Sequence, residues 1–192
     1  MTRFGCLPGW RIIENIATPF ELHFLIIPDE CWTSASIRTL GGKDKIIEAL
    51  SIASSLSHEV GGELWIGVHV GYSAGQNLPH LHYHVLRPCR VSKAEIDVPA
   101  SPSPSTIVTS TDDFVVFAGG TRTGQCIFVP TDDNDDFTPD TGVVSFSAIL
   151  DEMIRMINLK FRSKQGLGPD FAVGIKMIDG RIIYAYLAPI LN

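Results

Sequence analysis

The chain lacks the marks of a disulfide scaffold and of a membrane protein. Its four cysteines, Cys6, Cys31, Cys89 and Cys126, are far apart and form no Cys-x-x-Cys pair, which argues against a stapled secreted domain. The apolar runs are no longer than a strand, and the first residues, 1–5, contain no apolar signal segment. We therefore expect a cytoplasmic protein with no membrane partner.

Positive charge is also scarce. The 192 residues include 15 Lys and Arg against 21 Asp and Glu, a formal net charge of −6. Duplex nucleic acid needs many cationic phosphate contacts, so we expect no duplex nucleic acid as partner. A small-molecule nucleotide is still compatible with this charge, because backbone amides and a few side chains are enough to bind it. With 45% hydrophobic residues, the chain is long enough to bury a core.

The first half of the chain has the pattern of an α+β unit. Apolar residues predict strands at 12–13 and 23–28, and a helical stripe covers 43–56. Two further strands are predicted at 64–70 and 80–86. The order strand, strand, helix, strand, strand indicates a helix packed on an antiparallel sheet.

The second half repeats this pattern after a segment rich in proline and serine. The segment Cys126–Pro130 matches Phe24–Pro28, and a helix and two strands follow in the same order, at 149–159, 171–175 and 183–189. Self-similarity of this kind suggests a duplicated unit. We predict a domain at 1–90, a linker at 91–106 and a degenerate copy at 107–192, forming two pseudo-symmetric lobes. No histidine follows His84, so the copy lacks the chemistry described next.

Three histidines alternate at every second residue: His80, His82 and His84. Side chains at this spacing share one face of a strand, whereas Leu81 and Tyr83 face the other way. Each imidazole needs a partner or water, so a row of three indicates a site. Three chemistries suit it: metal binding, an acid–base relay near neutral pH, or nucleophilic attack on phosphorus by the central ring.

The surrounding residues favour phosphorus chemistry. No Asp or Glu occurs between Glu63 and Glu95, so the carboxylate ligands of many metal sites are missing. Residues 75–79 form a tight polar segment whose backbone N–H groups and amide side chains suit a phosphate.

The motif Gly75-Gln76-x-x-Pro79-His80-x-His82-x-His84 resembles the signature of the histidine-triad (HIT) superfamily. The upstream segment Asn15-Ile16-x-x-Pro19-x-x-x-His23 is similar to the ribose-binding strand pair of that family. The similarity covers residues 10–88 and implies a HIT-like antiparallel sheet.

The resemblance also implies roles for individual residues. His82 would attack the α-phosphorus and form a nucleotidyl-histidine, His80 would orient it, and His84 would bind the phosphate and the leaving oxygen. His23 matches a position that we expect to be structural. The nucleotide-binding residues implied are Asn15 for the ribose, Ile16 and Phe24 for the base, and His69, Gln76 and Asn77 around the phosphate.

The chain departs from the family in two places. His69 stands where the family usually has Asn or Gln, which affects the preference for a leaving group. The Cys-x-x-Cys of zinc-bearing relatives is missing, and Cys6, Cys31 and His80 are the residues that would remain of such a site. We expect incidental thiols, no metal and no cofactor.

The full triad resembles the hydrolases of the family more than its transferases, which typically have Gln at the position of His84. We therefore expect a nucleotide hydrolase acting on a nucleoside phosphoramidate, a dinucleoside polyphosphate or a nucleotide conjugate. The alternative is a nucleotidyltransferase or phosphorylase resembling galactose-1-phosphate uridylyltransferase and the diadenosine-polyphosphate phosphorylases. A non-catalytic nucleotide-binding protein is the third hypothesis. The chain would be a monomer of two lobes or a homodimer.

Overall fold

The computed structural model describes residues 8–16, 18–32, 40–74, 76, 78–87, 107–112, 114–119, 125–131, 148–153, 155–156 and 170–189. The predicted linker at 91–106 and Asn77 lie outside these residues, so the structure does not test either of them.

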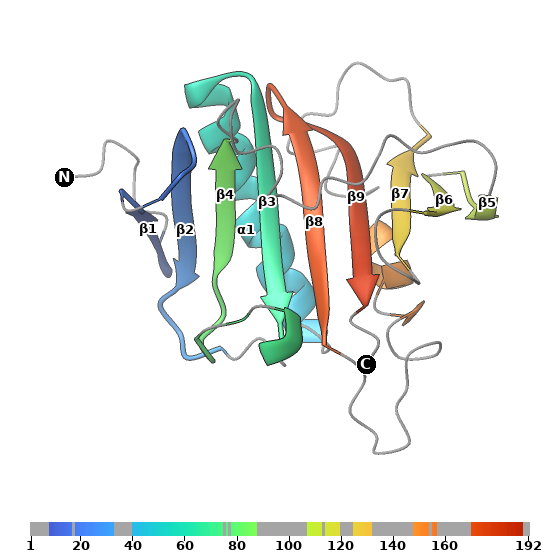
Figure 1. Ribbon diagram of the computed structural model, residues 1–192, viewed down its shortest axis with the longest axis horizontal. Coiled ribbons are helices and arrows are strands. Elements are labelled where there is room, and N and C mark those ends of the chain that lie inside the picture. Colours follow the sequence, from blue (N-terminus) through green and yellow to red (C-terminus); the bar gives the residue numbers. More distant parts are fainter. Residues whose placement is uncertain are drawn as a thin grey trace.

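One antiparallel sheet of nine strands runs through the described residues (Figure 1). Its strands are β1 (Trp10–Glu14), β2 (Leu22–Pro28), β3 (Glu63–Val70), β4 (Tyr83–Arg87), β5 (Ile107–Ser110), β6 (Phe114–Ala118), β7 (Cys126–Pro130), β8 (Phe171–Ile178) and β9 (Arg181–Pro189). The strand order is β1-β2-β4-β3-β8-β9-β7-β6-β5, and neighbouring strands are antiparallel. The two halves therefore share one sheet through the β3–β8 pair.

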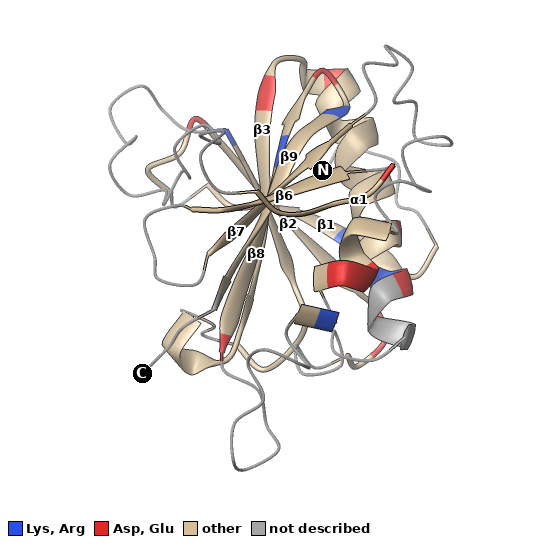
Figure 2. Ribbon diagram, turned by 90° about the vertical axis from the view of Figure 1, so that its right-hand side faces the viewer, with Lys and Arg blue, Asp and Glu red and all other residues tan. Residues whose placement is uncertain are grey.

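Helices cover one face of this sheet. Helix α1 (Leu40–Val60) lies on one side of the twisted strands (Figure 2), and it buries Ile46, Leu50, Ala53 and Leu56 at helical spacing. The helical residues 148–153 and 155–156 add Ile149, Leu150, Met153 and Met156 to the same core. Helix α1 starts before the predicted 43–56, and it includes the two glycines that were expected to precede it. No helix of the described chain is both long and apolar enough to cross a bilayer.

Alternation along the strands separates this core from an open face. In β2, Phe24 and Ile26 are buried in the core, and His23 lies on the opposite side. In the first half, each predicted strand is present with shifted ends. The histidine strand is the shortest relative to expectation, since β4 begins only at Tyr83. Before the strand begins, Leu81 donates its backbone N–H to Trp32 O (2.7 Å), outside the regular strand pairing.

The turn between β8 and β9 is fastened to the first half of the chain. Gly180, with φ of 81°, donates its N–H to Ser57 Oγ (2.9 Å) and accepts from Ser54 Oγ (3.2 Å), both on α1. Asp179 Oδ1 accepts from the N–H of Gly62 at 2.6 Å. These bonds and the β3–β8 pair hold the two halves in one body, so residues of both halves can line a common cavity.

Candidate active site

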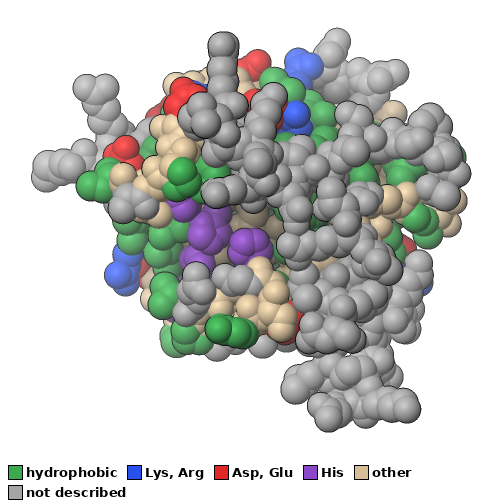
Figure 3. All heavy atoms as spheres, in the orientation of Figure 1, with side chains coloured by type: hydrophobic (Ala, Val, Ile, Leu, Met, Phe, Trp, Pro, Cys, Tyr) green, Lys and Arg blue, Asp and Glu red, His purple; other side chains and the backbone are tan. Residues whose placement is uncertain are grey.

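Four histidine rings meet on the open face of the sheet. The ring centroid of His84 lies 5.0 Å from that of His82, 5.2 Å from that of His23 and 5.8 Å from that of His69. They come from β4, the residue before it, β2 and β3. In the space-filling view the histidines gather in one hollow (Figure 3). His84 is the centre of this group because its strand lies between β2 and β3 in the sheet.

The ring of His82 is held in one orientation by the backbone. Its Nδ1 lies 2.9 Å from the carbonyl oxygen of His80. A carbonyl only accepts hydrogen bonds, so Nδ1 carries the hydrogen and Nε2 keeps its lone pair. The ring of His80 in turn donates from Nε2 to Pro28 O on β2 (3.1 Å). This arrangement turns a basic nitrogen of His82 outward, as a nucleophile requires.

His84 is kept neutral. Burial, and then the neighbouring His82, His69 and His23, lower its pKa from 6.5 to about 3. Burial also lowers the pKa of His23. At pH 7 the rings of His23 and His84 are therefore both uncharged, and they are joined by a hydrogen bond of 3.0 Å between His23 Nε2 and His84 Nδ1.

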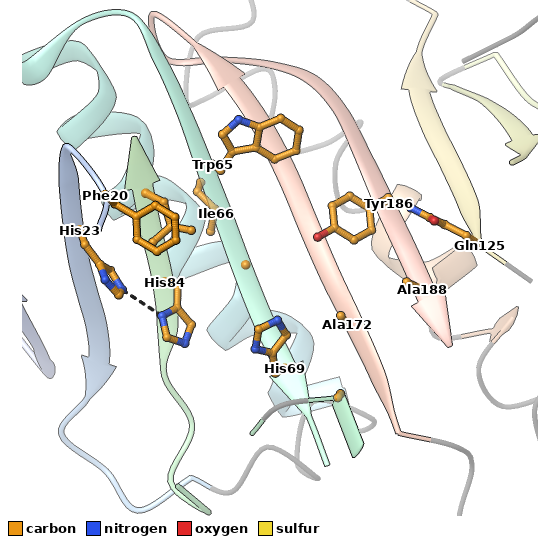
Figure 4. A pocket seen from close by; sticks show the side chains of 13 residues that line it. Phe20, His23, Trp65, Ile66, His69, His84, Gln125, Ala172, Tyr186 and Ala188 are labelled. Carbon is orange, nitrogen blue, oxygen red and sulfur yellow. Dashed lines mark hydrogen bonds between the residues drawn. The ribbon is translucent and has the colours of Figure 1, made fainter. Parts of the chain in front are cut away.

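A cavity of about 370 Å³ extends from these histidines across the sheet (Figure 4). Its lining residues are Phe20, His23, Trp65, Ile66, Gly67, His69, Ala74, His84, Leu86, Gln125, Ala172, Tyr186 and Ala188. Neither His80 nor His82 belongs to this lining, although the ring of His82 touches that of His84 at one end. Both halves of the chain therefore contribute to the space beside the histidines.

One glycine, Gly67, lines the cavity, and it pairs with Gly174 on the neighbouring strand. His84 pairs with Gly67, Gly67 with Gly174, and Gly174 with Tyr186, in one row across β4, β3, β8 and β9. A Cβ on Gly174 would stand 2.1 Å from Tyr186 Cε1, so the ring lies directly over the glycine. A Cβ on Gly67 would meet nothing closer than 3.8 Å. The row spans about 14 Å at the usual strand spacing, which is enough for a phosphate and one ring.

The lining carries no full charge. None of the described residues that line the cavity is Lys, Arg, Asp or Glu. Within the described parts of the chain, no three His, Cys, Asp or Glu side chains are placed to hold a metal ion. Cys31 is exposed, and Cys6 lies outside the described residues.

The structure brings only some of the predicted nucleotide-binding residues to the histidines. His69 lines the cavity, and Asn15 Nδ2 lies 3.2 Å from Nδ1 of His23. Ile16 is 88% exposed in the loop after β1. Phe24 is buried in the core on the opposite face, because it alternates with His23 along β2; its predicted place in the base pocket is corrected accordingly.

Gln76, in the predicted phosphate loop, and Asp170, from the second half of the chain, both hydrogen-bond in this region. Gln76 Oε1 accepts from the N–H of Gly71 (2.8 Å), and its amide donates to Leu78 O. Asp170, just before β8, accepts from the N–H of Ser73 at 2.8 Å. Gln76 therefore shapes the loop through its own hydrogen bonds, and the second half of the chain supports that loop.

Several residues of the cavity were not predicted from the sequence. Trp65 and Gly67 alternate with His69 on β3, so the alternation that singled out the triad was also a signal for them. Tyr186 and Gln125 gave no such signal, because their place depends on how β8, β9 and β7 pair.

Comparison with known proteins gives matches among solved structures alone. No family model and no curated protein matches the chain. A DUF4931 family protein from Bacillus cereus aligns with a TM-score of 0.64 and 11% identity, over 98% of this chain and 86% of that chain. A GALT-like protein from Arabidopsis thaliana aligns with a TM-score of 0.60 and 15% identity, over 96% and 75%. ADP-glucose phosphorylase from Arabidopsis thaliana, with bound ADP-glucose, aligns with a TM-score of 0.60 and 14% identity, over 96% and 73%.

The chain has a HIT-like fold. The likeness extends over almost the whole chain, which confirms the resemblance stated from residues 75–84. At identities of 11–15% it shows the HIT-like fold alone. The HIT-like fold here is mostly sheet, with nine antiparallel strands in the described residues.

Proposed function

We propose that this HIT-like protein transfers a nucleotidyl group by a covalent two-step mechanism. The lone pair of His82 Nε2 attacks the α-phosphorus of a nucleotide conjugate, and the bond from phosphorus to the leaving oxygen breaks. The oxygen of an acceptor then attacks the nucleotidyl-histidine, and the P–N bond breaks to restore His82. The observation that carries this proposal is the hydrogen bond from His82 Nδ1 to His80 O (2.9 Å), which leaves Nε2 as the nucleophilic atom.

The acceptor is an organic or inorganic phosphate in this proposal, as in nucleotidyltransferases and phosphorylases. The chain is similar in fold to a GALT-like protein and to ADP-glucose phosphorylase, which supports the alternative from sequence analysis over hydrolysis. The cavity of about 370 Å³ also supports it, because a water molecule occupies only about 30 Å³. Hydrolysis is the second candidate, and it is favoured by the complete triad with histidine at His84.

The nucleoside would lie on the β1–β2 side of the histidines. We propose that Asn15 and Ile16 bind the ribose and the base, and that His69 and the backbone near Asn77 contact the phosphate. Transfer rather than hydrolysis would also explain why the cavity continues beyond His84 toward Tyr186.

We further propose that the two halves are copies of one unit. The order β1-β2-β4-β3 in one half is mirrored by β6-β7-β9-β8 in the other, and Gly67 pairs with Gly174 between them. In this view the second unit has kept its packing and supplies one wall of the cavity.

An acceptor experiment tests the proposed function. The protein is incubated with a labelled nucleotide sugar or dinucleoside polyphosphate in ¹⁸O-water, with and without inorganic phosphate or a sugar phosphate. We expect the acceptor to raise product formation at least about tenfold and to carry the nucleotidyl group. A nucleoside monophosphate labelled from water, formed at the same rate without acceptor, would instead identify a hydrolase. Binding without turnover would identify a nucleotide-binding protein.

A further inference from the structure

A line of hydrogen bonds runs from His84 through His23 to the loop between β1 and β2. Asn15 Nδ2 and Thr18 Oγ1 lie 3.2 and 3.1 Å from Nδ1 of His23. On the other side of the same ring, Nε2 lies 3.0 Å from Nδ1 of His84. The ring of His23 is 7% exposed, and Phe20 packs edge-on against it with centroids 5.6 Å apart. His23 is thus a buried link between the β1–β2 loop and the triad.

The chemistry of these atoms fixes the hydrogens along the line. The amide nitrogen of Asn15 only donates, so Nδ1 of His23 accepts and the hydrogen of that neutral ring is on Nε2. His23 Nε2 then donates to Nδ1 of His84, and the hydrogen of His84 is left on its own Nε2. We propose that His23 is a positioning residue that fixes His84 as the Nε2–H tautomer and so makes it a hydrogen-bond donor to the cavity.

Two triad histidines would then present Nε2 to the same phosphate in different states, one with a lone pair and the other with a hydrogen. The carbonyl of His80 leaves a lone pair on Nε2 of His82, whereas His23 leaves a hydrogen on Nε2 of His84. The low pKa of His84, near 3, agrees with this arrangement. The titratable groups around it are His23 on β2, His69 on β3 and the adjacent His82, and all three lower that pKa.

A neutral donor of this kind restricts the leaving group. His84 hydrogen-bonds the oxygen on which charge develops and gives up no proton, because losing Nε2–H would leave an imidazolate. The leaving group must therefore depart as an anion, as a phosphate does and an amine does not. This role rests on the proposed function and favours phosphoanhydrides over phosphoramidates; the tautomer itself does not depend on it.

The tautomers can be measured without substrate. Long-range ¹H–¹⁵N correlation spectra of the full chain with ¹⁵N-labelled histidine distinguish Nδ1–H from Nε2–H rings. At pH 7 we expect His84 as the neutral Nε2–H form and His82 as the Nδ1–H form. An Nδ1–H form or a mixture for His84 in the wild-type protein would overturn the proposal, whatever the enzyme assays show.

Two substitutions separate positioning from packing. His23→Gln keeps an amide nitrogen facing His84, since Asn15 and Thr18 orient its oxygen toward themselves. His23→Leu fills a similar space without a donor. We expect His23→Leu to mix the tautomers of His84 and to lower kcat at least about tenfold with KM within about twofold, and His23→Gln to restore the tautomer and most of kcat. Equal losses in both variants, with His84 still Nε2–H, would show that His23 only packs.

Discussion

Replacing His82 with alanine is expected to lower turnover by about 10⁴-fold or more, while the protein stays folded. The ring that is removed forms the covalent bond in the proposed mechanism, and its Nδ1 anchor, the carbonyl of His80, cannot supply a nucleophile. The ring is partly exposed at the open face, so its removal costs little packing. Steady-state kinetics and a thermal unfolding curve measure the two effects separately.

The matched control is His58→Ala. His58 is an exposed histidine in the last turn of α1, and its ring packs on the Gly180 turn, not in the cavity. It should therefore keep wild-type turnover. Turnover of His82→Ala within about tenfold of wild type would reject the covalent mechanism.

Acidification is expected to destabilise the protein, because the folded protein buries His84 and His23 in their neutral form. The pKa of His84 falls from 6.5 to about 3 on folding, so below pH 6.5 the unfolded chain binds a proton that the folded chain does not. The stability that depends on neutral His84 is present above pH 6.5 and is lost as the pH falls toward 3. One such group contributes up to about 1.4 kcal/mol per pH unit, or about 2 kcal/mol between pH 6.5 and 5. His23 acts in the same direction.

Urea unfolding between pH 7.5 and 5 measures this loss in the wild type and in two variants. His84→Gln removes the titrating ring. The free energy of unfolding should then fall less between pH 7.5 and 5, by the amount that His84 contributes in the wild type. Leu86→Gln is the control, because it introduces the same glutamine two residues further along β4. Its free energy of unfolding should fall with pH as steeply as in the wild type, whatever its overall stability. An equally steep loss in His84→Gln would assign the pH dependence to other groups.

The local part of this architecture was predictable from the sequence. A period of two residues placed His82 beside His84 and buried Leu81, Tyr83 and Val85. The helical period of α1 was clear for the same kind of reason, because each signal depends only on neighbours in the sequence.

The features that depend on strand pairing were not predictable. The register of β3 with β8 places Gly67 opposite Gly174, and the register of β8 with β9 places Tyr186 over that glycine. No local pattern encodes either contact. Phe24 was misplaced because the family resemblance was used where alternation with His23 gives the opposite face.

The central claim is that His82 carries the nucleotidyl group, and mass spectrometry of the trapped intermediate tests it most directly. The protein is mixed with a labelled nucleotide conjugate without acceptor, quenched at alkaline pH, where a phosphoramidate bond survives, and digested. We expect one added nucleotidyl group on the peptide containing residues 80–84, with fragments that place it on His82. A modification on His80, His84 or His69, or turnover with no adduct at all, would contradict it.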